Sequence, residues 1–284
     1  MKILRSTADF IEWRHLQGED IGFVPTMGNL HAGHISLLET SLKEHATSVL
    51  SIFVNPTQFG PADDFDRYPR TLDADAKLAE AALKKYPGKQ LVIFAPAAPS
   101  EIYPPGFGSA ISVPSLDGFL EGALRPGHFT GVATVVYLLL SLVKPRSAYF
   151  GRNDYQQYRV IKRMVRDLAL PVRVKGMPIV RDEHGLALSS RNQYLSTDER
   201  QTALHLIRTL KEAERRLGGE SKNAPQVRSW MQKQMNEDSR WQYLEVREAR
   251  GLGENLPAKG KVVFLAVLKV GPVRLLDNLE VELT

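Results

Sequence analysis

The first 180 residues alternate short apolar segments with longer amphipathic ones, and this alternation restricts the folds open to the chain. We interpret the short apolar segments as strands at 21–25, 48–54, 91–95, 147–150 and 172–177; the one at 48–54, for example, is too short and too rich in β-branched residues for a helix. Apolar residues recur at helical spacing over 35–45, 72–83, 131–143 and 155–168. Strands separated by helices predict an α/β fold with a Rossmann-like, doubly wound parallel sheet. The continuous apolar character of the strands agrees, because such a sheet is covered on both faces.

The pattern changes after about residue 178. Two helices are expected, at 197–217 and 224–236. Three short apolar segments follow, with a Gly271-Pro272 turn between the last two, and they predict a small antiparallel sheet at 241–246, 261–268 and 273–276. We therefore predict a Rossmann-like domain over residues 1–178 and a smaller C-terminal α+β domain over residues 179–284.

Composition excludes several kinds of chemistry. The chain has no cysteine, which rules out disulfides, thiolate catalysis and cysteine-bound zinc or iron–sulfur centres. The longest apolar stretch covers only residues 132–143, whereas a bilayer span needs about 20 residues. The net charge of +5 is scattered, and its densest cluster, at 159–166, has the helical spacing of a solvated face. We expect a cytoplasmic protein that binds neither membrane nor nucleic acid.

One motif between a predicted strand and a predicted helix combines two glycines with two histidines. It reads PTMGNLHAGH over residues 25–34. Gly28 and Gly33 let the backbone approach a ligand closely, and the start of the helix offers free N–H groups to a phosphate. His31 and His34 could donate to phosphate oxygens as charge builds up in a transition state. A turn that needs glycine for its geometry alone is the competing interpretation, and a zinc site lacks an obvious third ligand.

Three further polar segments stand where ligands of such folds bind. Asn55 and Gln58 follow the second strand, GRNDYQQ at 151–157 follows the strand at 147–150, and LSSRN at 188–192 lies near the predicted domain boundary. Ligands of open α/β sheets bind at the carboxyl ends of the strands. Each segment also has a structural interpretation, namely an Asn-Pro turn, a helix cap at Asp154 and a polar linker. Their joint placement favours a binding site.

The motifs together resemble those of a known family. PTMGNLHAGH is followed in order by FVNPTQF, YPR at 68–70, RPGHFTGVATVV at 125–136, YFGRNDYQQ and GLALSSRNQYL. In order and spacing they are similar to those of the pantothenate synthetases (pantoate–β-alanine ligases) over nearly the whole chain. The resemblance implies the nucleotidyltransferase-like α/β fold, whose H-x-G-H signature is shared with class I aminoacyl-tRNA synthetases, and it implies a homodimer.

The resemblance also implies a reaction. Such enzymes adenylate pantoate with ATP, release pyrophosphate, and then let the amine of β-alanine displace AMP to give pantothenate. His34 matches the family's proton-donor position, and His31 joins it at the nucleotide phosphates. Gln58 and Gln157 match the residues that hold pantoate, and Gln58 would also meet β-alanine. Catalysis would come mainly from positioning and from stabilising charge on the phosphates.

The ATP-binding positions implied by the resemblance come from both predicted domains. They are Met27, Gly28, Asn29, Leu30, His31, Ala32, Gly33, His34, Gly151, Arg152, Asn153, Asp154, Val180, Leu188, Ser189, Ser190 and Arg191. Residues 1–178 would then bind nucleotide and pantoate, while residues 179–284 would close over the ATP site. Mg²⁺ is expected to accompany ATP. The sequence identifies no metal ligand, and Asp75 is only a candidate.

One position departs from the family pattern. Where the family reads F-G-x-K-D, with the lysine on the ATP phosphates, this chain has the neutral amide Asn153. Arg152 is adjacent, but arginine and lysine are not interchangeable. Two alternatives therefore stay open. One is a nucleotidyltransferase that acts on another small substrate, and the other is a weakly active or non-catalytic nucleotide-binding homologue.

Overall fold

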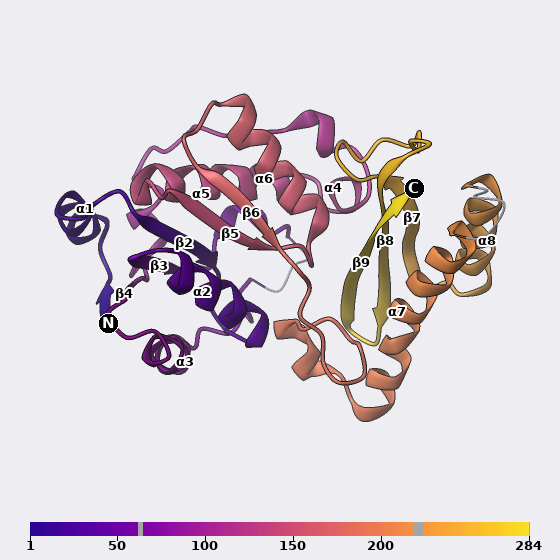
Figure 1. Ribbon diagram of the computed structural model, residues 1–284, viewed down its shortest axis with the longest axis horizontal. Coiled ribbons are helices and arrows are strands. Elements are labelled where there is room, and N and C mark those ends of the chain that lie inside the picture. The colour runs from indigo at the N-terminus through magenta and orange to yellow at the C-terminus, as the bar shows by residue number, and fades with distance from the viewer. Residues whose placement is uncertain (62–64, 219–223, 284) are drawn as a thin grey trace. The chain divides into compact units, whose positions relative to one another are not determined.

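A computed structural model describes residues 1–61, 65–218 and 224–283 (Figure 1). Its contacts divide the chain into two compact units. The first comprises Met1–Arg152 and Val160–Pro178, and the second comprises Asn153–Arg159 and Ile179–Thr284. The segment 153–159 thus groups with the second unit, although its neighbours in sequence on both sides belong to the first. The functional division between nucleotide binding in residues 1–178 and closure by residues 179–284 stays a prediction.

A six-stranded parallel sheet forms the centre of the first unit, in the order β1–β4–β3–β2–β5–β6. The strands are β1 (Lys2–Leu4), β2 (Ile21–Thr26), β3 (Thr47–Ile52), β4 (Gln90–Phe94), β5 (Ser147–Gly151) and β6 (Arg173–Met177). Strands β3 and β4 follow β2 on one side of it, and β5 and β6 are then added on its other side. The topological switch point therefore lies between β2 and β5. Ligands of such sheets bind outside the carboxyl ends of the strands at this point.

Helices connect these strands. They are α1 (Thr7–His15), α2 (Ala32–Glu44), α3 (Leu72–Lys84), α4 (Glu121–Leu124), α5 (His128–Val143) and α6 (Tyr155–Asp167), with short 3₁₀ turns η1 (Pro56–Gln58), η2 (Pro99–Glu101) and η3 (Pro114–Leu116). Helices α2 and α3 pack against the strands through a buried cluster that includes Leu38, Leu42 and Ala79. Helix α5 contains the longest apolar stretch of the chain, and most of its side chains are buried. This stretch is therefore a core helix.

The second unit contains a three-stranded antiparallel sheet in the order β7–β8–β9. Its strands are β7 (Trp241–Glu248), β8 (Gly260–Val270) and β9 (Val273–Leu283), and its helices are η4 (Ser190–Tyr194), α7 (Thr197–Leu217) and α8 (Ala224–Glu237). Side chains such as Leu206, Met231 and Phe264 form one buried core between the two long helices and the sheet. The two units together confirm the predicted fold class.

The structure differs from the sequence prediction mainly at the ends of elements. Strand β1 and helix α1 were not predicted, because β1 has only three residues and α1 lacks a clear apolar stripe. Helix α2 begins at Ala32, three residues earlier than predicted, which places His34 in its first turn. Strands β8 and β9 are longer than predicted. Within the described residues, no helix has the length and apolar character needed to cross a membrane.

Candidate active site

The histidine motif forms the connection between β2 and α2, at the carboxyl end of β2. Gly28 (φ 86°) and Asn29 (φ 50°) both adopt the left-handed conformation, which turns the chain before α2. Glycine is favoured at position 28 for a second reason, because a Cβ there would lie 3.0 Å from Oδ2 of Asp75 and 3.1 Å from Cγ2 of Ile52. The loop is therefore constrained both by its own backbone and by its neighbours.

A buried carboxylate from α3 holds this loop. Asp75 is 1% exposed, its Oδ1 accepts from the N–H of Leu30 at 2.7 Å, and its Oδ2 accepts from the N–H of Asn29 at 3.0 Å. The hydroxyl of Thr71 also donates to Oδ2, at 3.2 Å. Asp75, a metal candidate on its sequence alone, therefore holds the histidine loop through backbone hydrogen bonds. Helical spacing could have indicated that Asp75 is buried, because it lies three residues after Leu72 and four before Ala79 on the apolar side of the helix, whereas Asp73 is exposed.

Backbone hydrogen bonds orient the two histidines at the start of α2. Nδ1 of His31 accepts from the N–H of Gly33 at 3.1 Å, and Nδ1 of His34 accepts from the N–H of His31 at 3.4 Å. A neutral imidazole whose Nδ1 accepts a hydrogen bond carries its proton on Nε2. The two rings lie side by side, with centroids 4.1 Å apart. This arrangement assigns the Nε2–H tautomer to both rings.

The surroundings favour the neutral form of both imidazoles. Burial lowers the pKa of His31. Burial, with a smaller contribution from the neighbouring His31, lowers the pKa of His34 to about 3. The cause is that a buried imidazolium loses hydration, and a second imidazolium alongside would repel it. At neutral pH the pair therefore offers N–H donors without a formal positive charge.

Gln58 lies in η1, just after β3, and Asn55 orients its side-chain amide. Nδ2 of Asn55 donates to Oε1 of Gln58 at 3.0 Å. The Gln58 Nε2 group therefore points elsewhere, and it lies 3.3 Å from Sδ of Met27 in the histidine loop. The structure thus brings Gln58 and Met27, from two separate motifs, into contact within the first unit.

Three residues not singled out from the sequence support Gln58 and Asn55. The hydroxyl of Tyr103 donates to Oδ1 of Asn55 at 2.7 Å, and Nδ1 of His128 lies 2.8 Å from the carbonyl oxygen of Gln58. Gly131 allows α5 to approach η1 closely, since a Cβ there would lie 2.3 Å from a backbone oxygen of η1. The motif RPGHFTGVATVV contains His128 and Gly131 and could have indicated them, whereas no sequence signal indicates Tyr103.

The predicted ATP-binding segment after β5 leads into α6. Strand β5 ends at Gly151, and Oδ1 of Asp154 accepts from the N–H of Gln157 at 3.3 Å. Asp154 therefore hydrogen-bonds the first turn of α6, as the structural interpretation of this residue proposed. The carbonyl oxygen of Asn153 accepts a hydrogen bond from a β9 side chain. Its side-chain Oδ1 is buried and has no hydrogen-bond partner among the described residues.

Val180 and Leu188, both predicted to bind ATP, lie at the two ends of a hairpin over residues 180–188. The N–H of Leu188 donates to the carbonyl oxygen of Val180 at 2.9 Å, and Gly185 (φ 94°) lies in the turn. The chain then enters η4, where Oγ of Ser189 accepts from the N–H of Arg191 at 3.2 Å. The hairpin therefore brings Val180 next to Leu188, although eight positions separate them in sequence.

The predicted site residues fall into two groups. The first unit contains residues 27–34, Gln58, Gly151 and Arg152, and the second contains Asn153, Asp154, Gln157, Val180 and residues 188–191. Contacts within each unit join several members of each group. That the two groups act as one site stays a prediction.

The described residues form no preassembled metal centre. Among them, no group of three or more histidine, aspartate or glutamate side chains is placed to hold a metal ion. Both oxygens of Asp75 already accept hydrogen bonds from the histidine loop. The described residues therefore do not fit a Mg²⁺ site built by the protein alone.

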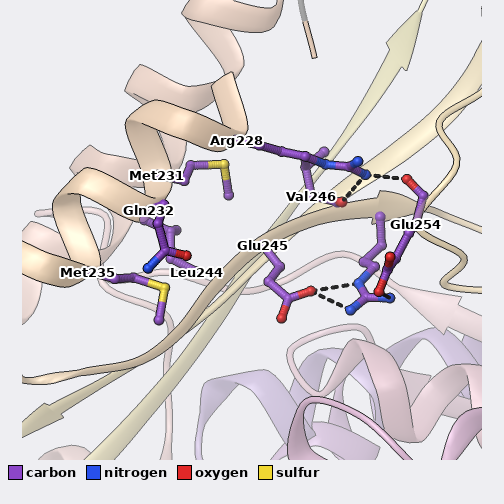
Figure 2. A pocket seen from close by; sticks show the side chains of 9 residues that line it. Arg228, Met231, Gln232, Met235, Leu244, Glu245, Val246 and Glu254 are labelled. Atoms are coloured by element: carbon purple, nitrogen blue, oxygen red, sulfur yellow. Dashed lines mark hydrogen bonds and ion pairs between the residues drawn. The ribbon is translucent and has the colours of Figure 1, made fainter. Parts of the chain in front are cut away.

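A cavity of about 280 Å³ lies between α8 and β7 in the second unit (Figure 2). Met231 and Met235 of α8 line it, and none of its nine lining residues is a predicted site residue. Three of its charged side chains are paired, since Arg247 lies 2.6 Å from Glu245 and 3.3 Å from Glu254, and the fourth, Arg228, donates to the backbone carbonyl oxygens of Val246 and Glu254. The cavity therefore contributes no side chain to the candidate site.

Comparison with known proteins identifies the family. A family model described as Pantoate-beta-alanine ligase matches residues 2–280. The chain belongs to the pantoate-beta-alanine ligase family. The membership predicted from the motifs is confirmed, and so is the predicted enzyme class, a pantoate–β-alanine ligase.

Relatives and solved structures of this ligase family match nearly the whole chain. The pantothenate synthetase of Rhizobium etli is 45% identical over 277 residues, covering 97% of this chain and 90% of its own, and that of Acetivibrio thermocellus is 44% identical, covering 99% and 100%. A crystal structure of the Thermus thermophilus pantothenate synthetase has a TM-score of 0.87 at 40% identity, covering 98% and 99% of the two chains. A Francisella tularensis pantoate-beta-alanine ligase, complexed with beta-gamma ATP and beta-alanine, has a TM-score of 0.76 at 32% identity, covering 98% and 97%.

Proposed function

We propose that the chain condenses pantoate with β-alanine to give pantothenate, at the expense of ATP and through a pantoyl-adenylate intermediate. AMP and pyrophosphate are the other products. The observation that carries the proposal is the pair of neutral Nε2–H donors, His31 and His34, held by backbone bonds beside the switch point of the sheet. Donors fixed before the reaction stabilise developing phosphate charge without having to reorganise.

In the first step, a carboxylate oxygen of pantoate attacks the α-phosphorus of ATP. The bond between the α-phosphorus and its bridging oxygen to the β-phosphorus breaks, and pyrophosphate leaves with that electron pair. His31 and His34 donate hydrogen bonds from Nε2 to the phosphate oxygens. Without ATP the pKa of His34 is lowered to about 3, so the imidazole is neutral and presents an Nε2–H donor to the incoming phosphates.

In the second step, the neutral amine of β-alanine attacks the acyl carbon of the adenylate, the bond from that carbon to the phosphate oxygen breaks, AMP leaves with the electron pair, and the nitrogen loses a proton to solvent. Gln58 and Gln157 hold pantoate in this proposal, and Gln58 also meets β-alanine. The contact of Asn55 with Oε1 of Gln58 supports this role, because it directs the Nε2–H₂ group of Gln58 to donate to a substrate oxygen. A buried amide oriented in this way discriminates strongly against a ligand that lacks the matching acceptor.

The remaining ATP contacts are proposed from the resemblance. They comprise residues 27–34, 151–154, Val180 and 188–191. Mg²⁺ would accompany ATP, with phosphate and water oxygens supplying most of its ligands. A cytoplasmic homodimer that binds only small molecules completes the proposal.

The proposal is tested by following ATP–pyrophosphate exchange and AMP formation while each substrate is omitted in turn. Exchange of labelled pyrophosphate into ATP is expected with pantoate alone, and AMP release at a steady rate is expected only with β-alanine added. Exchange that requires β-alanine would contradict an adenylate intermediate. Exchange without pantoate would favour a nucleotidyltransferase of another substrate.

The alternative of a weakly active homologue depends on Asn153, which stands where the family has a lysine. The buried Oδ1 without a partner among the described residues shows that this amide is not satisfied in the way a structural asparagine usually is. If the phosphates need a cation at this position, Asn153→Lys should raise the rate of adenylate formation, with little change in pantoate binding. Single-turnover adenylation measures this effect. If Arg152 already supplies the charge, Arg152→Ala should be severely impaired and Asn153→Lys should gain little, whereas an unchanged rate in both variants would remove both positions from the phosphate contacts.

A further inference from the structure

Strand β9 carries two consecutive buried polar residues to which the proposed reaction assigns no role. Asp277 and Asn278 are 3% and 4% exposed, although the residues around them in the strand are mostly apolar. Side chains of consecutive strand residues point to opposite faces of the sheet. One strand can therefore contact two different segments through these neighbours.

Asp277 holds the hairpin over residues 180–188 through Arg181. The two guanidinium nitrogens Nη1 and Nη2 donate to its carboxylate oxygens at 2.6 and 2.8 Å. Nη1 of Arg181 also donates to the carbonyl oxygen of Gly185 at 3.0 Å, inside the hairpin turn. A bidentate pair of this kind fixes orientation as well as distance. Since Arg181 directly follows Val180, the pair fixes the position of the hairpin against β9.

Asn278 holds the segment that leads into α6. Its Nδ2 donates to the carbonyl oxygen of Asn153 at 2.9 Å. Glu280, two residues further along the same face of β9, accepts from the hydroxyl of Tyr155 at 2.8 Å. Two side chains of β9 therefore hold two points of the short segment 153–155, all within the second unit.

We infer that Asp277 and Asn278 are positioning residues that set the spacing between residues 153–154 and the segment 180–191, which carries the proposed ATP-binding residues Val180 and 188–191. The inference rests on the proposed function, which assigns ATP binding to these residues. Adjacent Cα atoms are about 3.8 Å apart, so consecutive anchors on a paired strand leave little freedom between the segments they hold. Correct spacing matters because a misplacement of about 1 Å can reduce a rate by roughly a hundredfold.

The test compares Asn278→Ala, Asn278→Asp and the control Glu282→Ala in the full-length protein. Asn278→Asp keeps the shape of the side chain but places a carboxylate oxygen opposite the carbonyl oxygen of Asn153. Glu282 lies on the same strand and is exposed. The measurements are the KM values for ATP and β-alanine, the Kd for ATP by calorimetry, and the melting temperature.

Both Asn278 variants are expected to raise the KM and Kd for ATP roughly tenfold, as loss of a buried hydrogen bond predicts, with the KM for β-alanine unchanged. Glu282→Ala should change none of these values. An unchanged Kd for ATP, an equal rise in the KM for β-alanine, or loss of folding in both Asn278 variants would overturn the inference. If the unaltered protein binds ATP but forms no pantothenate, the proposed function fails, while weaker ATP binding by the variants would still support the positioning role.

Discussion

Two buried aspartates, one in each unit, hold segments that carry proposed ATP-binding residues, and they are satisfied in different ways. Asp75 accepts hydrogen bonds from the backbone N–H groups of Asn29 and Leu30. Asp277 is paired with the guanidinium group of Arg181. Backbone donors determine the conformation of a loop, whereas a guanidinium determines where one side chain lies. The guanidinium partner of Asp277 can be removed by substitution, which leaves, among the described residues, only the N–H of Asn278 donating to its Oδ1 at 2.7 Å, whereas the backbone donors of Asp75 cannot be removed in this way.

The largest expected effect comes from breaking the charged pair on one side only. Arg181→Met leaves the Asp277 carboxylate, which is 3% exposed, without its guanidinium. An uncompensated buried charge of this kind should lower the free energy of unfolding by about 3 kcal/mol. Urea unfolding at pH 7 measures the loss. The control is Arg215→Met, which breaks an exposed pair with Glu212 at a similar distance of 2.7 Å and should change stability little.

Equal losses in Arg181→Met and Arg215→Met would contradict the distinction between buried and exposed pairs. The double variant Arg181→Met/Asp277→Leu sharpens the result. It removes both charges, so it should recover much of the stability lost in Arg181→Met.

The second effect comes from changing the carboxylate whose partners are backbone groups. Asp75→Asn places an amide nitrogen opposite the N–H of either Asn29 or Leu30, so one buried donor loses its acceptor. We expect the free energy of unfolding to fall by about 2 kcal/mol. The rate of adenylation should fall by roughly tenfold or more, because the histidine loop shifts.

Single-turnover adenylation and urea unfolding check the Asp75 prediction, with Asp73→Asn on the exposed side of the same helix as the control. A rate that stays normal while stability falls would mean that the loop does not depend on Asp75 for its active conformation.

The sequence predicted the loops but not the residues that hold them. Apolar runs and glycine-rich turns are local, so the strands β2, β3 and β5 and the histidine loop could be predicted from short windows. The contact between Asp75 and Asn29 joins residues 46 positions apart, and the contact between Asn278 and Asn153 joins residues 125 positions apart. Such pairings depend on topology. In β9, Asp277 and Asn278 follow two leucines and precede a third, but the strand also carries Arg274, Glu280 and Glu282, so its sequence alone does not mark the pair as buried.

The third effect is a loss of stability in acid that comes from the first unit. The pKa of His34 is lowered to about 3 in the folded protein, against about 6.5 when unfolded, so between these values the unfolded state binds more protons. Stability from this group is complete above about pH 6.5 and falls as the pH drops toward 3. Between pH 6.5 and 5.5 the expected loss is about 1 kcal/mol.

Urea unfolding of the unaltered protein and of His34→Gln over this pH range measures the difference. The slope with pH should be shallower in His34→Gln. Identical slopes would show that His34 is not held in its neutral form by the fold.

The smallest expected effect comes from removing one neutral hydrogen bond, in contrast to breaking the charged pair at Asp277. Tyr103→Phe removes the hydroxyl that donates to Oδ1 of Asn55 at 2.7 Å. Asn55 keeps its contact with Gln58, and its Oδ1 still accepts from the N–H and hydroxyl of Thr57, at 3.3 and 3.0 Å. The buried amide therefore stays satisfied, and the cost should be only about half a kcal/mol.

We expect the KM for pantoate to rise roughly twofold to threefold, with the KM for ATP unchanged. Tyr86→Phe, outside the Asn55 network, is the control. A tenfold or greater rise in the KM for pantoate would mean that Asn55 cannot orient Gln58 without Tyr103. The neutral hydrogen bonds around Asn55 would then be as sensitive to the loss of one partner as the Arg181–Asp277 pair.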